Sequence, residues 1–323
     1  MFGNNLVRTC CIVLVIAILD VAVVWAVPPE RIFVTNERDD SVSVIDGSTN
    51  AVVATIAIGQ RPRGIGVSPD ATEVYVAVSE DNAIAVFDPQ TFEVLRTFES
   101  GDDPETFAVH PNGNIYISNE EDAKASVFNP KTGEKVAEIK VGIEPEGVAI
   151  SPDGTKVIVT SESTNMLHVI AVPEHAIVNN ILVGARPRAA TFNHSGKLAY
   201  ATSEISGEVK KVDIASGTVI AKMPLADDRA KPKDILLSTD GTKLYVAGGR
   251  ANQIFILDEA TLEILHTVPV GKRVWGLALS KDGTLLYTTD GVSNQVSVID
   301  TVHFKVVATV PVGKFPWGIA VYP

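Results

Sequence analysis

The chain has 323 residues, a formal net charge of −12 and two cysteines. An acidic domain of this kind is poorly suited to coating nucleic acid, because non-specific binding to phosphates depends on lysine and arginine. Both cysteines, Cys10 and Cys11, lie near the start. The rest of the chain therefore has no thiol for disulfides, thiolate metal sites or haem attachment.

The first residues differ in composition from the rest. Arg8 precedes an apolar stretch, and the small residues Val24 and Ala26 form a cleavage pattern. Asp20 interrupts the stretch and argues against a stable membrane span. We therefore predict a cleaved secretory signal peptide over residues 1–26 and a single domain over 27–323. Removing the signal takes away one arginine and one aspartate, so the net charge stays the same.

From residue 31 onward, a unit of 41 to 45 residues is repeated around seven turns of the Gly-x-x-Pro type. The equivalent turn residues are Pro62, Pro104, Pro145, Pro187, Pro232, Val274 and Pro316. Each unit holds four short runs of alternating apolar residues, rich in valine and isoleucine, with no sustained helical period. In one representative unit, strands are predicted at 147–150, 157–160, 167–170 and 176–183.

Four antiparallel strands in each of seven units predict an all-β, seven-bladed β-propeller. Residues 31–59 supply the last three strands of a blade, and residues 318–322 supply a lone first strand. We expect these two segments to pair and to close the ring. Closure of this kind removes the open sheet edges that invite aggregation.

Several repeats share a characteristic sequence motif. Phe-Val-Thr-Asn at 33–36 precedes Ser-Val-Ser-Val-Ile-Asp at 41–46, and the last repeat has Ser-Val-Ile-Asp at 297–300. These runs resemble the YVTN family of β-propeller repeats over residues 31–323. Within that family the chain is similar to propellers associated with catabolism dependent on pyrroloquinoline quinone (PQQ). The resemblance implies a periplasmic accessory of quinoprotein dehydrogenases, which are possible partners, and it carries over no catalytic residue.

In a propeller, the loops that join one blade to the next share a face with the loops between strands two and three. Five contiguous blade-joining loops are basic, and two are acidic. Basic side chains beside tryptophans predict an anion site with an aromatic wall, which would suit the planar tricarboxylate PQQ. We expect the basic heads to face solvent when no ligand is bound. The predicted ligand-binding residues are Arg61, Arg63, Arg186, Arg188, Lys231, Lys233, Lys272, Arg273, Trp275, Lys314 and Trp317.

An alternative is that the charges on this face satisfy one another. Four units place a carboxylate at the same position in the loop between strands two and three, and these carboxylates are positioned to pair with the neighbouring cations. They are Glu37, Glu120, Glu162 and Glu204.

The sequence predicts no metal site and requires no cofactor. No two histidines have the spacing of metal ligands, and the run 120–122 lacks the spacing of a calcium loop. The histidines are His110, His168, His175, His194, His266 and His303.

The favoured function is a non-catalytic propeller that binds a protein partner or a small anion. One alternative is a lactonase-like hydrolase, for which Glu105 and Glu146 beside Arg63 and Arg188 are the candidate groups. Another is single-stranded DNA binding, with tryptophans of the mouth as stacking platforms, although the net charge opposes it.

Overall fold

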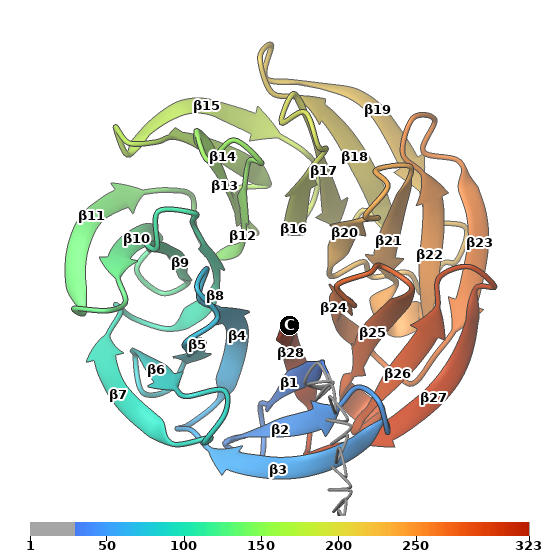
Figure 1. Ribbon diagram of the computed structural model, residues 1–323. Coiled ribbons are helices and arrows are strands. Elements are labelled where there is room, and N and C mark those ends of the chain that lie inside the picture. The colour runs from blue at the N-terminus through green and yellow to red at the C-terminus, as the bar shows by residue number, and fades with distance from the viewer. Residues whose placement is uncertain (1–29, 323) are drawn as a thin grey trace, which may run out of the picture.

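The computed structural model describes residues 30–322. Seven antiparallel sheets of four strands stand around one axis (Figure 1). This arrangement confirms the predicted seven-bladed, all-β propeller. The predicted signal peptide over 1–26 lies outside the described residues, and it stays a prediction.

In every blade the first strand lies nearest the axis and the fourth lies at the rim (Figure 1). From the axis outward, the first four blades are β28 (Pro316–Tyr322), β1 (Arg31–Asn36), β2 (Ser41–Asp46), β3 (Ala51–Ala57); β4 (Pro62–Val67), β5 (Val74–Val78), β6 (Ala83–Phe87), β7 (Val94–Glu99); β8 (Pro104–Val109), β9 (Ile115–Asn119), β10 (Lys124–Asn129), β11 (Glu134–Lys140); and β12 (Pro145–Ile150), β13 (Lys156–Ser161), β14 (Met166–Ala171), β15 (Ala176–Leu182).

The last three blades follow the same order, with short 3-10 turns in two of their loops. They are β16 (Pro187–Phe192), β17 (Leu198–Ser203), β18 (Glu208–Asp213), β19 (Thr218–Pro224); β20 (Ile235–Leu237), β21 (Lys243–Ala247), η1 (Gly249–Ala251), β22 (Gln253–Asp258), β23 (Ile264–Pro269); and β24 (Val274–Leu279), β25 (Leu285–Asp290), η2 (Gly291–Ser293), β26 (Gln295–Asp300), β27 (Lys305–Pro311).

The core lies between the blades. Val74, Val76 and Val78 of β5 pack into a cluster with Phe33 of the preceding blade, whereas Tyr75 and Ala77 point to the opposite face and pack against the following blade. Because side chains alternate along a strand, the two middle strands of a blade bury both faces. This explains why some of these strands, such as β5 and β6, are continuous apolar runs and not alternating ones.

The two ends of the described chain close the ring, as predicted. β28 pairs with β1 in antiparallel register, from Arg31 opposite Tyr322 to Asn36 opposite Pro316. Ile319 and Val321 of β28 pack with Ile32 and Val34 of β1. One sheet therefore joins segments that are almost 300 residues apart in the sequence.

Candidate functional site

Seven side chains occupy equivalent positions at the start of the innermost segments, each directly after the turn residue. We call them the inner ring. Its members are Arg63, Glu105, Glu146, Arg188, Lys233, Trp275 and Trp317.

Buried hydroxyl groups fix the backbone of the inner ring. The Thr160 hydroxyl accepts the Gly147 N–H at 2.8 Å and donates to the Arg188 carbonyl of the next blade at 3.1 Å. Thr35, Ser118, Thr202 and Thr289 repeat this bridge to other inner-ring carbonyls. The inner strands come so close that a Cβ on Gly147 would lie 2.3 Å from the Arg188 carbonyl oxygen. Packing therefore holds the inner ring at fixed positions.

A cavity of about 180 Å³ lies along the axis beside the inner ring. Its wall consists mostly of the small and apolar residues that follow the inner ring, with Glu146, Arg188, Lys233 and both tryptophans also lining it. Asp234 is the one aspartate in this wall. Burial raises its pKa to about 6, and its carboxylate accepts the Leu277 N–H of the next blade at 2.9 Å.

Backbone hydrogen bonds confirm that the blade-joining loops share a face with the loops between strands two and three. The Glu204 N–H donates to the Arg186 carbonyl at 2.8 Å, and the Gly291 N–H donates to the Arg273 carbonyl at 2.9 Å. We call this face the channel mouth. All the predicted ligand-binding residues lie on its loops or in the inner ring beside them.

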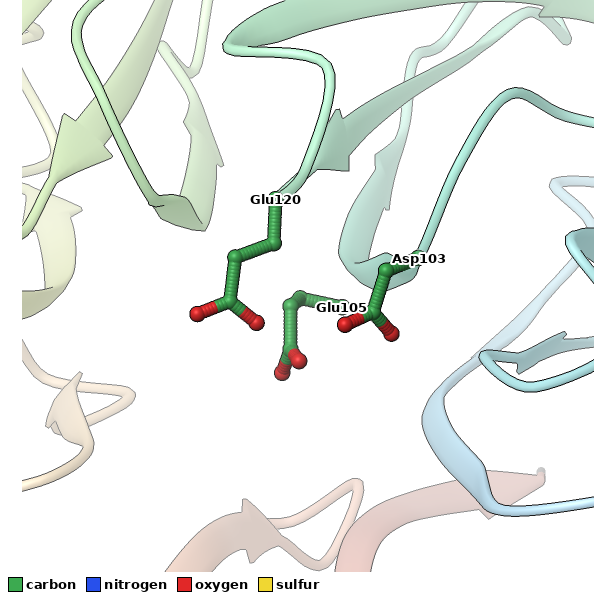
Figure 2. Close-up of side chains that lie close together, drawn as sticks. All are labelled: Asp103, Glu105 and Glu120. Atoms are coloured by element: carbon green, nitrogen blue, oxygen red, sulfur yellow. The ribbon is translucent and has the colours of Figure 1, made fainter.

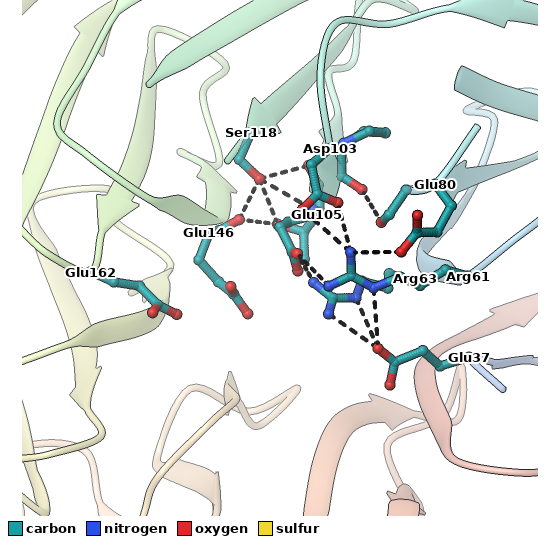
Figure 3. A network of polar contacts seen from close by, with 12 residues as sticks. Glu37, Arg61, Arg63, Glu80, Asp103, Glu105, Ser118, Glu146 and Glu162 are labelled. Atoms are coloured by element: carbon teal, nitrogen blue, oxygen red, sulfur yellow. Dashed lines mark hydrogen bonds and ion pairs between the residues drawn. The ribbon is translucent and has the colours of Figure 1, made fainter. Parts of the chain in front are cut away.

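Most of the predicted cations of the mouth are already paired. Arg61 lies 3.5 Å from Glu37 and 3.3 Å from Asp103, and Arg63 contacts both Glu37 and Glu105 (Figure 3). In the loop before β28, Lys314 lies 3.2 Å from Asp39. In this part of the mouth, the charges pair with one another, as the alternative interpretation of the sequence predicted.

The pairing is tightest around Arg188. Its guanidinium lies 2.7 Å from Glu146, contacts Glu162 and lies 3.7 Å from Glu204. Lys233 adds a second cation 3.1 Å from Glu146. Arg188 and Lys233 are only 7% and 6% exposed, so the expectation that these heads face solvent is wrong. Neighbouring carboxylates hold them in the wall of the mouth.

The two tryptophans lie together, as an aromatic wall requires. The rings of Trp275 and Trp317 are stacked, with centroids 6.1 Å apart, and the Lys233 ammonium lies 4.1 Å from the Trp275 centroid. The Trp275 indole N–H is buried and has no acceptor among residues 30–322.

Opposite charges are missing in one part of the mouth. Where four blades have a glutamate after their second strand, the last two blades have Gly249 and Gly291. No carboxylate of the described chain lies within 4.0 Å of the cations there. We call these cations the basic sector; they are Lys231, Arg250, Lys272 and Arg273.

Within the basic sector, Arg273 lies over the Trp275 ring, with its guanidinium carbon 4.7 Å from the centroid. Burial lowers the pKa of Arg273, and the neighbouring charge of Arg250 lowers it further. The Asn252 side-chain oxygen accepts a hydrogen bond from the backbone N–H of Arg273. This bond connects the loop that carries Arg250 to the loop that carries Arg273. The sequence reasoning missed Arg250, although the glycine in place of glutamate at position 249 was a usable signal.

Carboxylates are in excess in another part of the mouth. We call Asp103, Glu105 and Glu120 the acidic sector (Figure 2). Glu120 has no cation within ion-pair distance in the described chain, unlike Glu37, Glu162 and Glu204, because both loops beside it are acidic. Burial, followed by the charges of Glu146 and Asp103, raises the pKa of Glu120 to about 7.

This raised pKa predicts a pH-dependent contribution to stability. Because the folded state binds the proton of Glu120 more tightly than the unfolded chain, the contribution is largest below about pH 4 and is lost as the pH rises to about 7. We expect Glu120→Gln to melt at a higher temperature than the parent at pH 8 and at the same temperature at pH 4.5. Thermal melts in chelator-containing buffer check this, with exposed Glu121→Gln as the control. An equal difference at both pH values would contradict the assignment.

No helix among residues 30–322 is long and apolar enough to cross a membrane.

Solved structures with the same fold come from several bacteria. Hydrazine synthase of Kuenenia stuttgartiensis is 22% identical, with a TM-score of 0.73 over 80% of this chain and 88% of that chain. A protein of unknown function from Desulfotomaculum acetoxidans is 16% identical, with a TM-score of 0.80 over 90% and 98%. A proposed 6-phosphogluconolactonase from Bacteroides fragilis is 18% identical, with a TM-score of 0.80 over 92% and 98%. At these identities the likeness shows the fold alone.

No curated protein matches the chain. Among family models, the YNCE-like β-propeller matches residues 4–120, and the choice-of-anchor I domain matches residues 103–286. The first match supports the predicted membership of a β-propeller family, while the PQQ-associated subgroup stays a prediction. Because the second match spans more than half of the sequence, the chain belongs to the choice-of-anchor I domain family.

Proposed function

We propose that this propeller is a non-catalytic, secreted binding protein that holds a small anion with a flat ring at the channel mouth. Two guanidinium groups that have no carboxylate partner among residues 30–322 carry this proposal: Arg273, which lies over the Trp275 ring, and the neighbouring Arg250. Guanidinium forks bind carboxylates and phosphates in two-point fashion. The resemblance to PQQ-associated propellers names PQQ as the ligand to test first and the periplasm as the compartment.

The basic sector suits an anion better than the rest of the mouth does. Arg63 and Arg188 have carboxylates on their guanidinium groups, so an incoming anion would have to displace them. Arg273 has no such competitor among the described residues. We therefore assign the main contacts to Arg273 and Arg250, with Lys231 and Lys272 contributing longer-range attraction.

Calorimetric titration with PQQ, citrate and a phosphate ester tests this proposal. Removing one arginine should weaken anion binding by about 1.5–3 kcal/mol, as expected for a hydrogen bond to a charged group, so Arg273→Ala should lose roughly 10- to 100-fold in affinity. Arg273→Lys should restore only part of it, because the planar fork is lost. Lys131→Ala, which removes an exposed cation paired with Asp70 in a turn on the opposite face, is the control.

Binding that is unchanged in the Arg250→Ala, Arg273→Ala double variant would contradict the assignment. If none of the three anions binds, the small-anion proposal fails. The basic sector would then remain a surface for an acidic protein partner, and a periplasmic quinoprotein dehydrogenase is the partner to test.

A hydrolase acting at the mouth is the second candidate. Glu105 and Glu146 do lie at the mouth, but each is held by a cation. Glu120 suits acid–base chemistry better, because its pKa of about 7 lies near neutral pH. A screen of lactones and esters separates the two functions. Turnover that is abolished by Glu120→Gln, Glu105→Gln or Glu146→Gln would favour the hydrolase.

A further inference from the structure

The acidic sector brings together three carboxylates that are not adjacent in the sequence. Asp103 lies in the loop before β8, Glu105 is the second residue of that strand, and Glu120 directly follows β9. One oxygen from each lies within 4.8 Å of the other two. Figure 2 shows the three side chains directed toward a common space.

A second observation comes from the burial of Glu105. Its side chain is completely buried, and while one carboxylate oxygen contacts Arg63, the other has no hydrogen-bond donor in the described chain. Burying a charged oxygen without a partner is costly. The second carboxylate oxygen of Glu105 is therefore available to bind a cation.

The local charge count points the same way. Around the acidic sector, two cations, Arg61 and Arg63, form ion pairs with four carboxylates, Glu37, Glu80, Asp103 and Glu105 (Figure 3). Glu120 adds a fifth carboxylate, which has no cation of its own in the described chain. The neighbouring cluster on the mouth is balanced, with three cations for three carboxylates: Arg186, Arg188 and Lys233 with Glu146, Glu162 and Glu204. Of these two clusters, only the one around the acidic sector has more carboxylates than cations.

We propose that the acidic sector binds one Ca²⁺ ion through Asp103, Glu105 and Glu120. Carboxylate oxygens are the ligands that hard divalent cations prefer. Oxygens that lie within 4.8 Å of one another can all reach one Ca²⁺ ion at Ca–O distances of roughly 2.3–2.6 Å. Ca²⁺ accepts irregular arrangements of carboxylates, whereas Mg²⁺ demands near-ideal octahedral geometry at about 2.0–2.1 Å. Three side-chain ligands leave further positions of the ion for water or a ligand at the mouth.

The site is separate from the basic sector and does not rest on the proposed anion binding. Asp103, Glu105 and Glu120 belong to the blade of β8–β11, whereas Arg250 and Arg273 belong to the blades of β20–β23 and β24–β27. Two whole blades, β12–β15 with Glu146 and β16–β19 with Arg188, come between them on one side of the ring. The two proposals can therefore fail independently.

Calorimetric titration of chelator-treated protein with CaCl₂ tests the proposal, with thermal melts in Ca²⁺ and in chelator as a second readout. We expect one ion per chain and a higher melting temperature in Ca²⁺. Glu120→Gln and Asp103→Asn should each weaken binding about tenfold or more. The control is Glu121→Gln, which removes an exposed carboxylate next to the site and should bind as the parent does.

Three results would overturn the proposal. The first is no heat and no melting shift at millimolar Ca²⁺. The second is binding by Glu120→Gln, shown to be folded by its melt, that is as tight as binding by the parent. The third is binding of Mg²⁺ with the same affinity, which would contradict the assignment to Ca²⁺.

Discussion

Deleting residues 318–323 is expected to unfold the ring or to make it aggregate. The deletion removes most of β28, which pairs with β1, and it takes Ile319 and Val321 out of the core between two blades. Each buried side chain lost costs about 2–5 kcal/mol, and a whole domain is stable by only about 5–15 kcal/mol. The edge of β1, no longer paired, would also be free to join another chain.

Thermal melting and size-exclusion chromatography measure this effect. A synthetic peptide covering residues 314–323, added in trans, should restore part of the melting temperature. The peptide contains β28 and can therefore pair again with β1, with Tyr322 opposite Arg31. A scrambled peptide of the same composition is the control. A truncated protein that melts like the parent would contradict closure of the ring by β28.

Arg188→Ala is expected to destabilise the fold by about 3–5 kcal/mol, the typical loss when one partner of a buried ion pair is removed. The substitution leaves the buried carboxylates of Glu146 and Glu162 with fewer cations to hold them. At roughly 2–4 °C per kcal/mol for a domain of this size, the melting temperature should fall by about 6–20 °C. Unfolding in urea gives the same quantity directly.

Arg186→Ala provides a matched control two residues away. The Arg186 side chain is 44% exposed and pairs with two of the same carboxylates, yet an exposed ion pair contributes only about 0–1 kcal/mol. The contrast between the two arginines tests whether burial decides the effect. Equal and small losses in both variants would show that the network around Arg188 is not structural.

The sequence was sufficient to predict the fold because the same pattern of turns and strands occurs in all seven units. Seven turns at a regular spacing and four alternating runs per unit all indicate the same architecture, so no single ambiguous strand decides it. The predicted strands at 147–150 and 167–170 differ from β12 and β14 by no more than two residues at each end. Closure was also predictable, since one strand at one end and three at the other complete a blade.

The site was predictable in position but only partly in chemistry. The repeat fixes which residues follow the turn, and therefore which side chains surround the mouth. It does not determine the distances between charges from different blades, which decide that Arg188 is buried and paired while Arg273 is not. Glu120 shows the same limit, because it shares its repeat position with paired glutamates and differs only in its neighbours.

Tryptophan fluorescence tests the central claim, ligand binding at the channel mouth, most directly. After residue 26 the chain contains only two tryptophans, Trp275 and Trp317, so the emission of a chain beginning at Val27 reports on the mouth alone. We predict saturable quenching by PQQ, corrected for absorption by the ligand, that is weakened about tenfold or more by Arg273→Ala and is unchanged by Lys131→Ala. Emission that shows no saturable change, or that saturates equally in the Arg250→Ala, Arg273→Ala variant, would contradict the claim.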